Sequence, residues 1–266
     1  MSSMFLAQEN GKIAYDDQGT GPLVICVPSM GDVRGEYRFL IPQLVSAGYR
    51  VVSMDVRGMG ESTTDWNDFS VAGIGRDIIA LIRELNAGPA VIVGTSMAAG
   101  AAVWAAAEAP GLIRATILVG PFVRGDGNWF LQTLFILLFA RPWGPSIWTK
   151  YYSTLYPSCK PADFGTYVNS LRENLKEQGR LESLMSMIRA SKRASEERLA
   201  AVKRPSLVIM GSRDPDFKDP EAEARWVAES LKTRYTMVEN AGHYPHAEMP
   251  DQVGPIMLEF MNALPA

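Results

Sequence analysis

The sequence predicts an α/β protein with a mostly parallel central sheet, helices on both faces of that sheet and a helical cap insertion. Two observations lead to this prediction. Short, nearly continuous apolar runs alternate with helical stretches in the first half, and such runs are typical of parallel strands covered on both faces. The alternation stops after Gly120 and resumes near residue 205. We therefore expect a core of residues 1–121 and 204–266 and a helical cap of residues 122–203.

Four apolar runs are predicted as fully buried strands, and two later segments are predicted as strands because the alternation of strands and helices resumes there. They are PLVICVP (22–28), RVVSMD (50–55), AVIVGTS (90–96), ATILVG (115–120), PSLVIMGSRD (205–214) and RYTMVENAGH (234–243). Their spacing along the chain is that of strands separated by helices. The cap would then lie over the carboxyl ends of the strands, where open α/β sheets bind their ligands.

Helices are predicted where apolar residues recur at helical spacing. The predicted ranges are 36–48, 69–85, 98–111, 220–232 and 250–264. Gly48 is expected to end the first, and Pro110-Gly111 the third, which is rich in alanine and can pack close to the sheet. Within the cap, the charged stretch 172–198 is expected to be a solvated helical face.

The composition excludes several classes of function. The chain has 266 residues and a formal charge of −3, so it shows no basic footprint for nucleic acid. Cys26 and Cys159 match neither a disulfide framework nor a metal motif, and Cys26 is expected to be a buried, inert thiol. No metal and no organic cofactor is implied. The oligomeric state is open.

The sequence favours a cytoplasmic protein without stable membrane insertion. The first residues show no charged region followed by an apolar core, so no export signal is expected. The most apolar window is 129–148, but its uninterrupted part ends at Arg141-Pro142 and is too short to span a bilayer. It is predicted as a buried helix, a pocket wall or an interfacial segment that could dock on a membrane.

Ser96 stands at the junction of a predicted strand and a predicted helix. Gly94 lies two residues before it and Ala98 two residues after it. A nucleophile elbow needs small residues at both positions, because its sharp turn brings the strand and helix backbones together. Glycine is the common residue at the second position, and alanine is a mild departure from it. A serine that only caps the helix is the alternative interpretation.

Two more candidate residues follow predicted strands. Asp214 comes after the strand at 205–214, and His243, one of two histidines, after the strand at 234–243. The order Ser96, Asp214, His243, each on a loop after a strand, resembles the catalytic triad of the α/β-hydrolase family. The resemblance covers nearly the whole chain. It is strengthened by MDVRGMGES (54–62), which is similar to the family's D-x-R-G-x-G-x-S loop.

The resemblance implies a role for each triad residue. Ser96 would attack an acyl carbonyl, His243 would take its proton, and Asp214 would orient and stabilise the imidazolium. Asp216 and Asp219 are nearby alternatives to Asp214 and are expected to be solvated loop carboxylates.

Other chemistry-bearing residues receive weaker expectations. Asp126 could be the acid in the alternative position that some family members use, and His246 is expected to be structural or at the edge of the pocket. Asp55 and Arg57 are expected to stabilise loops.

The oxyanion hole implied by the resemblance needs two backbone N–H groups. Met97, directly after the nucleophile, would supply one, and Met30 the other. Relatives usually have His-Gly before the second donor, whereas this chain has Pro28-Ser29. Ser29 is predicted either to offer its hydroxyl to the substrate or to stabilise the turn.

Aromatic residues of the cap are the candidates for lining the pocket, although each could instead belong to the core. They are Phe122, Trp129, Phe130, Phe135, Trp143 and Trp148. Together with Met30 and Met97 they indicate an apolar site and an uncharged or hydrophobic acyl substrate.

The function implied is a cofactor-independent serine hydrolase that cleaves an ester or lactone of a small, largely apolar molecule through an acyl-enzyme. A serine at the elbow argues against haloalkane dehalogenases and epoxide hydrolases, whose relatives use aspartate there. Thioesterase, amidase, carbon–carbon bond hydrolase and cofactor-free perhydrolase activities stay open, because the same triad performs each. A ligand sensor without turnover is the alternative from another class.

Overall fold

The computed structural model describes residues 3–8, 10–125, 138–139 and 142–265. These residues form an eight-stranded sheet in the order β1-β2-β4-β3-β5-β6-β7-β8. Its strands are β1 (Met4–Gln8), β2 (Gly11–Gln18), β3 (Leu23–Val27), β4 (Arg50–Met54), β5 (Ala90–Thr95), β6 (Ile113–Val119), β7 (Ser206–Gly211) and β8 (Arg234–Val238). The pairs from β4 through β8 are parallel, and β2 pairs antiparallel with β1 and with β4. The predicted mostly parallel sheet is confirmed.

The six predicted strands correspond to β3 through β8, whereas β1 and β2 were not predicted. Strands β3, β5 and β7 are buried at every residue, as their continuous apolar runs indicated. By contrast, β1 lies at the sheet edge and exposes Met4 and Phe5 by 45% and 50%. Its apolar stretch, MFLA (4–7), is short and shows no alternation, and a stretch of this length does not distinguish a strand from part of a helix.

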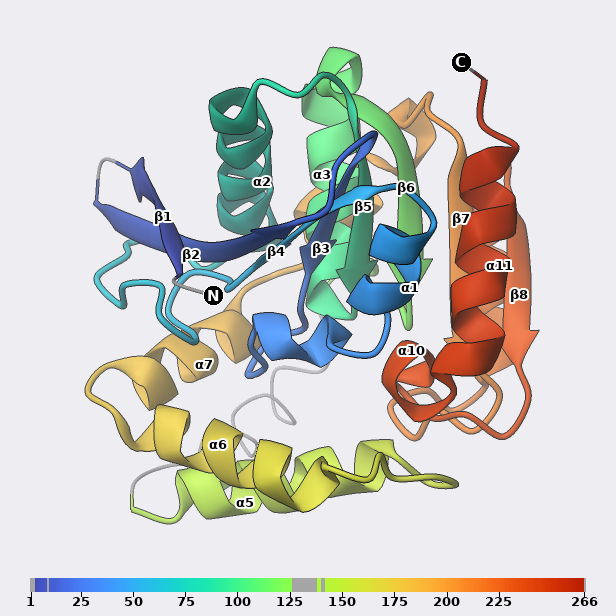
Figure 1. The fold of residues 1–266 in the computed structure, drawn as a ribbon. Coiled ribbons are helices and arrows are strands. Elements are labelled where there is room, and N and C mark those ends of the chain that lie inside the picture. Colours follow the sequence, from blue (N-terminus) through green and yellow to red (C-terminus); the bar gives the residue numbers. More distant parts are fainter. Residues whose placement is uncertain (1–2, 9, 126–137, 140–141, 266) are drawn as a thin grey trace.

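Helices cover both faces of the sheet (Figure 1). Residues of α2 (Val71–Leu85), α3 (Met97–Glu108) and α9 (Pro220–Leu231) pack on one face. Residues of α1 (Ile41–Ser46) and α11 (Pro250–Asn262) pack on the other. Alternate residues of β3 belong to the two apolar clusters, because successive side chains of a strand point to opposite faces.

Between β6 and β7 the described residues form helices and no strand. The helices are α5 (Gly144–Tyr152), α6 (Phe164–Lys176), α7 (Arg180–Arg189) and the short α8 (Arg193–Glu196). We call α5, α6 and α7 the cap helices. In Figure 1 the arrowheads of β6 and β8 point toward the side of the molecule on which α5 and α6 lie. The cap helices therefore stand near the carboxyl ends of the strands.

The cap helices share their packing with the sheet. Leu181, Leu184 and Met187 of α7 belong to the same apolar cluster as the strands and α3. The stretch 172–198 is thus amphipathic, with one buried face beside the solvated one that its charges predicted. The division of the chain into a core and a separate cap subdomain stays a prediction.

Within the described ranges, no helix has the length and apolar character needed to cross a bilayer. Most of the apolar window at 129–148 lies outside these ranges, and so do the predicted pocket residues Trp129, Phe130 and Phe135 and the alternative acid Asp126.

Candidate active site

Ser96 lies in the sharp turn between β5 and α3. Its backbone has φ 57° and ψ −121°, a region that residues other than glycine rarely occupy. Three backbone hydrogen bonds hold this conformation: the Ser96 N–H donates to Val119 O at 2.8 Å, and Ser96 O accepts the N–H groups of Ala99 and Phe122, both at 3.1 Å. A Cβ at Gly94 would lie 2.6 Å from the backbone oxygen of Ala98, so the turn leaves no room for a side chain there.

The Ser96 hydroxyl is not used for structure. It makes no capping hydrogen bond to α3, and the described residues give it no other hydrogen-bond partner. The alternative interpretation, a serine that caps the helix, therefore does not describe its contacts. The residue is only 3% exposed. These features are compatible with the predicted role of nucleophile, which also needs a base within reach of the hydroxyl.

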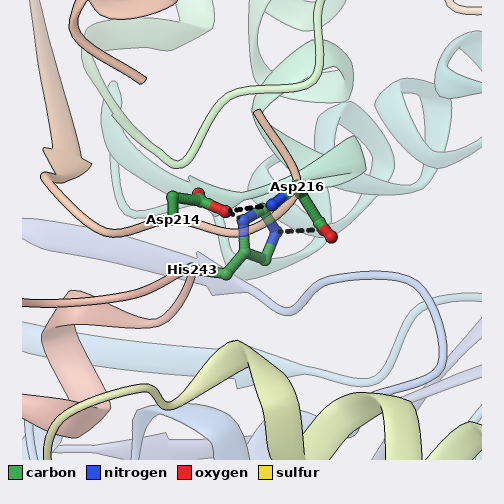
Figure 2. A group of neighbouring side chains, drawn as sticks. All are labelled: Asp214, Asp216 and His243. Carbon is green, nitrogen blue, oxygen red and sulfur yellow. Dashed lines mark hydrogen bonds and ion pairs between the residues drawn. The ribbon is translucent and has the colours of Figure 1, made fainter. Parts of the chain in front are cut away.

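Asp214 and His243 meet on the loops that follow β7 and β8 (Figure 2). The distance from His243 Nδ1 to Asp214 Oδ2 is 2.7 Å, and the residues are 1% and 2% exposed. In the neutral imidazole this hydrogen bond places the proton on Nδ1 and leaves Nε2 as the atom that can accept one.

The loop after β6 connects Ser96 to His243. Val119 and Phe122 bond to the Ser96 backbone, as described above. A Cβ at Gly120 would lie 3.1 Å from the His243 ring, and the Phe122 and His243 ring centroids are 5.8 Å apart. One short loop therefore contacts both the Ser96 backbone and the His243 ring.

Opposing effects set the pKa of His243. Burial lowers it, but the charge and hydrogen bond of Asp214 and then the charge of Asp216 raise it more, to about 9 from an ordinary value of 6.5. The imidazole is therefore protonated at neutral pH in the unliganded protein.

Asp216 is not the solvated carboxylate that its loop position suggested. Its side chain is 15% exposed, and Oδ2 lies 3.9 Å from His243 Nε2 (Figure 2). The Tyr151 hydroxyl donates to Oδ1, and the Asp216 N–H donates to Asp214 Oδ1 at 3.0 Å. Burial raises the pKa of Asp216, while His243 and Tyr151 lower it. Asp219, by contrast, is exposed and caps α9.

Ligand atoms of Asp214, Asp216 and His243 lie within 4.8 Å of one another, which is close enough for a metal ion. However, the 2.7 Å distance between Nδ1 and Oδ2 is that of a direct hydrogen bond. The contacts therefore favour a positioned imidazole at this cluster.

The predicted oxyanion-hole donors have free amides. Met97 is the first residue of α3, where an N–H has no partner inside the helix. Neither its amide nor that of Met30 donates a hydrogen bond to another described residue. Ser29 is 1% exposed, and its Oγ lies 2.6 Å from Tyr244 Oη. Of its two predicted roles, these contacts favour stabilisation of the turn.

The predicted pocket residues that the structure describes differ in their surroundings and in their exposure. The Phe122 and Phe217 ring centroids are 4.6 Å apart, and both rings contact His243. Trp148 is buried, and its Nε1–H donates to Gly31 O at 3.2 Å, close to Met30. Trp143 is 52% exposed. Phe217 was not among the sequence candidates, although it follows Asp214 by three residues.

The remaining polar candidates have structural contacts. Asp55 accepts the N–H groups of Arg34 and Glu61, and Arg57 forms a bidentate pair with the buried Asp77. Both residues therefore stabilise loops, as expected.

His246 and Cys26 are buried. His246 is fully buried, with Nε2 3.0 Å from Glu36 Oε1 but not aligned as a hydrogen bond. Burial raises the pKa of the Cys26 thiol, which fits an inert cysteine.

Comparison with known proteins places the chain among the hydrolases. Residues 24–255 match the model of the alpha/beta hydrolase family. The Mycobacterium tuberculosis protein that carries the name non-heme bromoperoxidase BpoC is 29% identical over 274 residues, covering 96% of this chain and 99% of the relative.

Solved structures share the fold over nearly the whole chain. A bromoperoxidase from Bacillus anthracis superposes with a TM-score of 0.87 at 18% identity, covering 98% of this chain and all of the other. A thermophilic esterase from Thermogutta terrifontis gives 0.82 at 21% identity, covering 98% of each. The family match, which spans most of the chain and all three triad candidates, shows that the protein belongs to the alpha/beta hydrolase family.

Proposed function

We propose that this protein is a serine hydrolase that cleaves an ester or lactone of a small, largely apolar substrate through an acyl-enzyme. The observation that carries the proposal is the strained backbone of Ser96, whose hydroxyl has no hydrogen-bond partner among the described residues. The loop after β6 contacts both Ser96 and His243, and His243 is hydrogen-bonded to Asp214. The esterase among the similar structures agrees with it.

In the proposed mechanism, neutral His243 removes the Ser96 proton through Nε2 while Oγ attacks the acyl carbon. The amides of Met30 and Met97 donate to the oxyanion that forms. When the carbon–oxygen bond breaks, the leaving alcohol takes the proton from His243. Water then attacks the acyl-enzyme, again with His243 as the base, and releases the acid and Ser96.

The surroundings of His243 favour an uncharged acyl group. The Phe122 and Phe217 rings border the imidazole, and the carboxylate of Asp216 lies 3.9 Å from Nε2. A substrate carboxylate at this place would be repelled by Asp216 and poorly solvated by the rings. Esters of neutral acids are therefore the proposed class.

Labelling with a fluorophosphonate probe tests the nucleophile. Wild type should be labelled, Ser96→Ala should not, and His243→Ala and Asp214→Asn should react far more slowly. Turnover of p-nitrophenyl butyrate should fall by about four to six orders of magnitude in the three variants. Asp219→Asn, on the same loop as Asp214, is the matched control and should keep wild-type rates.

Folding of each variant is checked by circular dichroism. If folded wild type is neither labelled nor active on p-nitrophenyl esters, thioesters and lactones, the hydrolase proposal is wrong. The ligand-sensor alternative would then describe the protein better.

A second candidate, perhydrolase activity, is favoured by the bromoperoxidase names of the relative and of one similar structure. In this reaction hydrogen peroxide instead of water attacks the acyl-enzyme, giving a peracid and free Ser96. Peracid formation from an ester and hydrogen peroxide would be measured in wild type and Ser96→Ala. Formation at the same rate in both proteins would exclude this candidate.

A further inference from the structure

The loop that carries the predicted donor Met30, residues 28–32, is here called the oxyanion loop. Three groups of Ser29, in this loop, form hydrogen bonds. The Ser29 N–H donates to Glu36 Oε2 at 2.8 Å, its carbonyl accepts the Asp32 N–H at 3.3 Å, and its hydroxyl bonds to Tyr244. Tyr244 directly follows His243, so this last bond joins the oxyanion loop to the loop of the catalytic histidine candidate.

Asp32 joins the same loop to the cap helices. The residue is completely buried. Its Oδ2 accepts the Tyr152 hydroxyl at 2.8 Å, and its Oδ1 accepts the Tyr167 hydroxyl and the Val33 N–H. Tyr152 ends α5, and Tyr167 lies in α6. The Trp148 Nε1–H of α5 also donates to Gly31 O at 3.2 Å.

The cap helices supply the side-chain donors that Asp32 needs. A buried carboxyl is costly unless its oxygens are hydrogen-bonded. Burial, and then the nearby Glu36 carboxyl, raise the pKa of Asp32, while Tyr167 and Tyr152 oppose that rise. Both tyrosines lie more than 100 residues from Asp32 in the sequence. The oxyanion loop therefore has its full set of hydrogen bonds only while α5 and α6 are docked.

We propose that Asp32 is a positioning residue, which aims the Met30 amide at the developing oxyanion by tying the oxyanion loop to Tyr152 and Tyr167 of the cap helices. The proposal rests on the proposed hydrolase function. It also gives a role to Ser29, which stands where relatives usually have glycine and whose hydroxyl bonds to Tyr244. The hydroxyl of Ser29 and the carboxyl of Asp32 together hold the loop from two sides.

The test compares Asp32→Asn with Asp163→Asn. Asparagine keeps the shape of Asp32, but its NH₂ group cannot accept a hydrogen bond. The hydroxyl of one tyrosine or the Val33 N–H therefore loses its acceptor. Asp163, at the start of α6, pairs with Arg38 at 2.7 and 2.8 Å and is 45% exposed. It therefore also links the cap to the body, but without touching the oxyanion loop, which makes it the matched control.

Three quantities are measured: kcat and KM on p-nitrophenyl butyrate, and the inhibition constant of a trifluoromethyl ketone. This inhibitor forms a tetrahedral oxyanion with the nucleophile. Because loss of one oxyanion donor costs about 100- to 1,000-fold in kcat, a displaced donor should cost about 10- to 100-fold. For Asp32→Asn we expect that fall in kcat, a similar weakening of the ketone and a KM within about threefold of wild type. Asp163→Asn should stay within about twofold throughout.

Several results would overturn the proposal. One is a folded Asp32→Asn protein with wild-type kcat, and another is a change in KM alone. A third is an equal fall in kcat in Asp163→Asn, which would point to cap docking in general.

If Asp32→Asn does not fold, Tyr152→Phe and Tyr167→Phe decide the question, because each removes a single hydroxyl. A fall in kcat with KM unchanged in either supports the proposal, and wild-type kcat in both refutes it. An inactive, unlabelled wild type marks instead a failure of the hydrolase function itself.

Discussion

The charge of His243 depends on two carboxylates of one loop, and this dependence predicts how activity varies with pH. A pKa of about 9 means that the neutral imidazole, which the proposed mechanism needs, is a minor form at pH 7. The value of kcat/KM for a substrate that does not ionise should therefore rise about tenfold per pH unit and level off above about pH 9.

Asp216→Asn should move this rise to lower pH, because it removes one of the charges that raise the pKa of His243. Asp219→Asn, which changes a carboxylate that caps α9, should leave the profile where it is. A rise centred near pH 6.5 in wild type, or profiles that coincide for wild type and Asp216→Asn, would contradict this account.

The same shift affects stability. The folded-state pKa of His243 exceeds its ordinary value of 6.5, so folding favours the protonated imidazole. This contribution to the free energy of unfolding is fully present below about pH 6.5 and is lost as the pH rises to about 9.

At the scale of elements, the close approach of β5 and α3 makes the turn at Ser96. Gly94→Ala would place a Cβ 2.6 Å from the Ala98 oxygen, which is backbone and cannot rotate away. We expect a loss of about 1–3 kcal/mol in the free energy of unfolding. The reaction of Ser96 with the fluorophosphonate should also slow, because the strand and helix must separate. Urea unfolding and labelling rates measure the two effects.

Gly165→Ala is the control for this prediction. A Cβ at Gly165, in the first turn of α6, would meet nothing within 4 Å, so alanine should stabilise the protein by up to about 1 kcal/mol. Equal stability of Gly94→Ala and wild type would show that the turn tolerates a side chain.

At the scale of the whole molecule, the shared core predicts a single cooperative unfolding transition. Leu184 of α7 is completely buried in the apolar cluster that also contains β3, β5 and α3. Leu184→Ala should cost about 2–5 kcal/mol and shift the urea midpoint equally by tryptophan fluorescence and by circular dichroism. Arg189→Ala, an exposed change on the same helix, should cost no more than about 0.5 kcal/mol. Two separate transitions would show instead a cap that unfolds independently.

Local sequence patterns were sufficient to predict the buried strands of the sheet. Strands β3 through β7 are predictable because a parallel strand covered on both faces needs an apolar run, and a run is visible within five or six residues. The edge strand β8 is buried only at Val238 and was predicted from the alternation of strands and helices along the chain. The edge strand β1 is half exposed and carries only a four-residue apolar stretch, which does not distinguish a strand from part of a helix. Its place in the sheet depends on pairing with β2, which the sequence of β1 alone does not encode.

By itself, the sequence determined which residues are candidates for the triad, because the order Ser96, Asp214, His243, each after a strand, resembles that of the α/β-hydrolase family. Only the tertiary structure decided that Asp216 faces His243 Nε2, and that Asp32 receives hydroxyls from Tyr152 and Tyr167. The physical reason is distance along the chain. A contact across more than 100 residues depends on how the cap helices dock on the sheet, and no local periodicity records that docking.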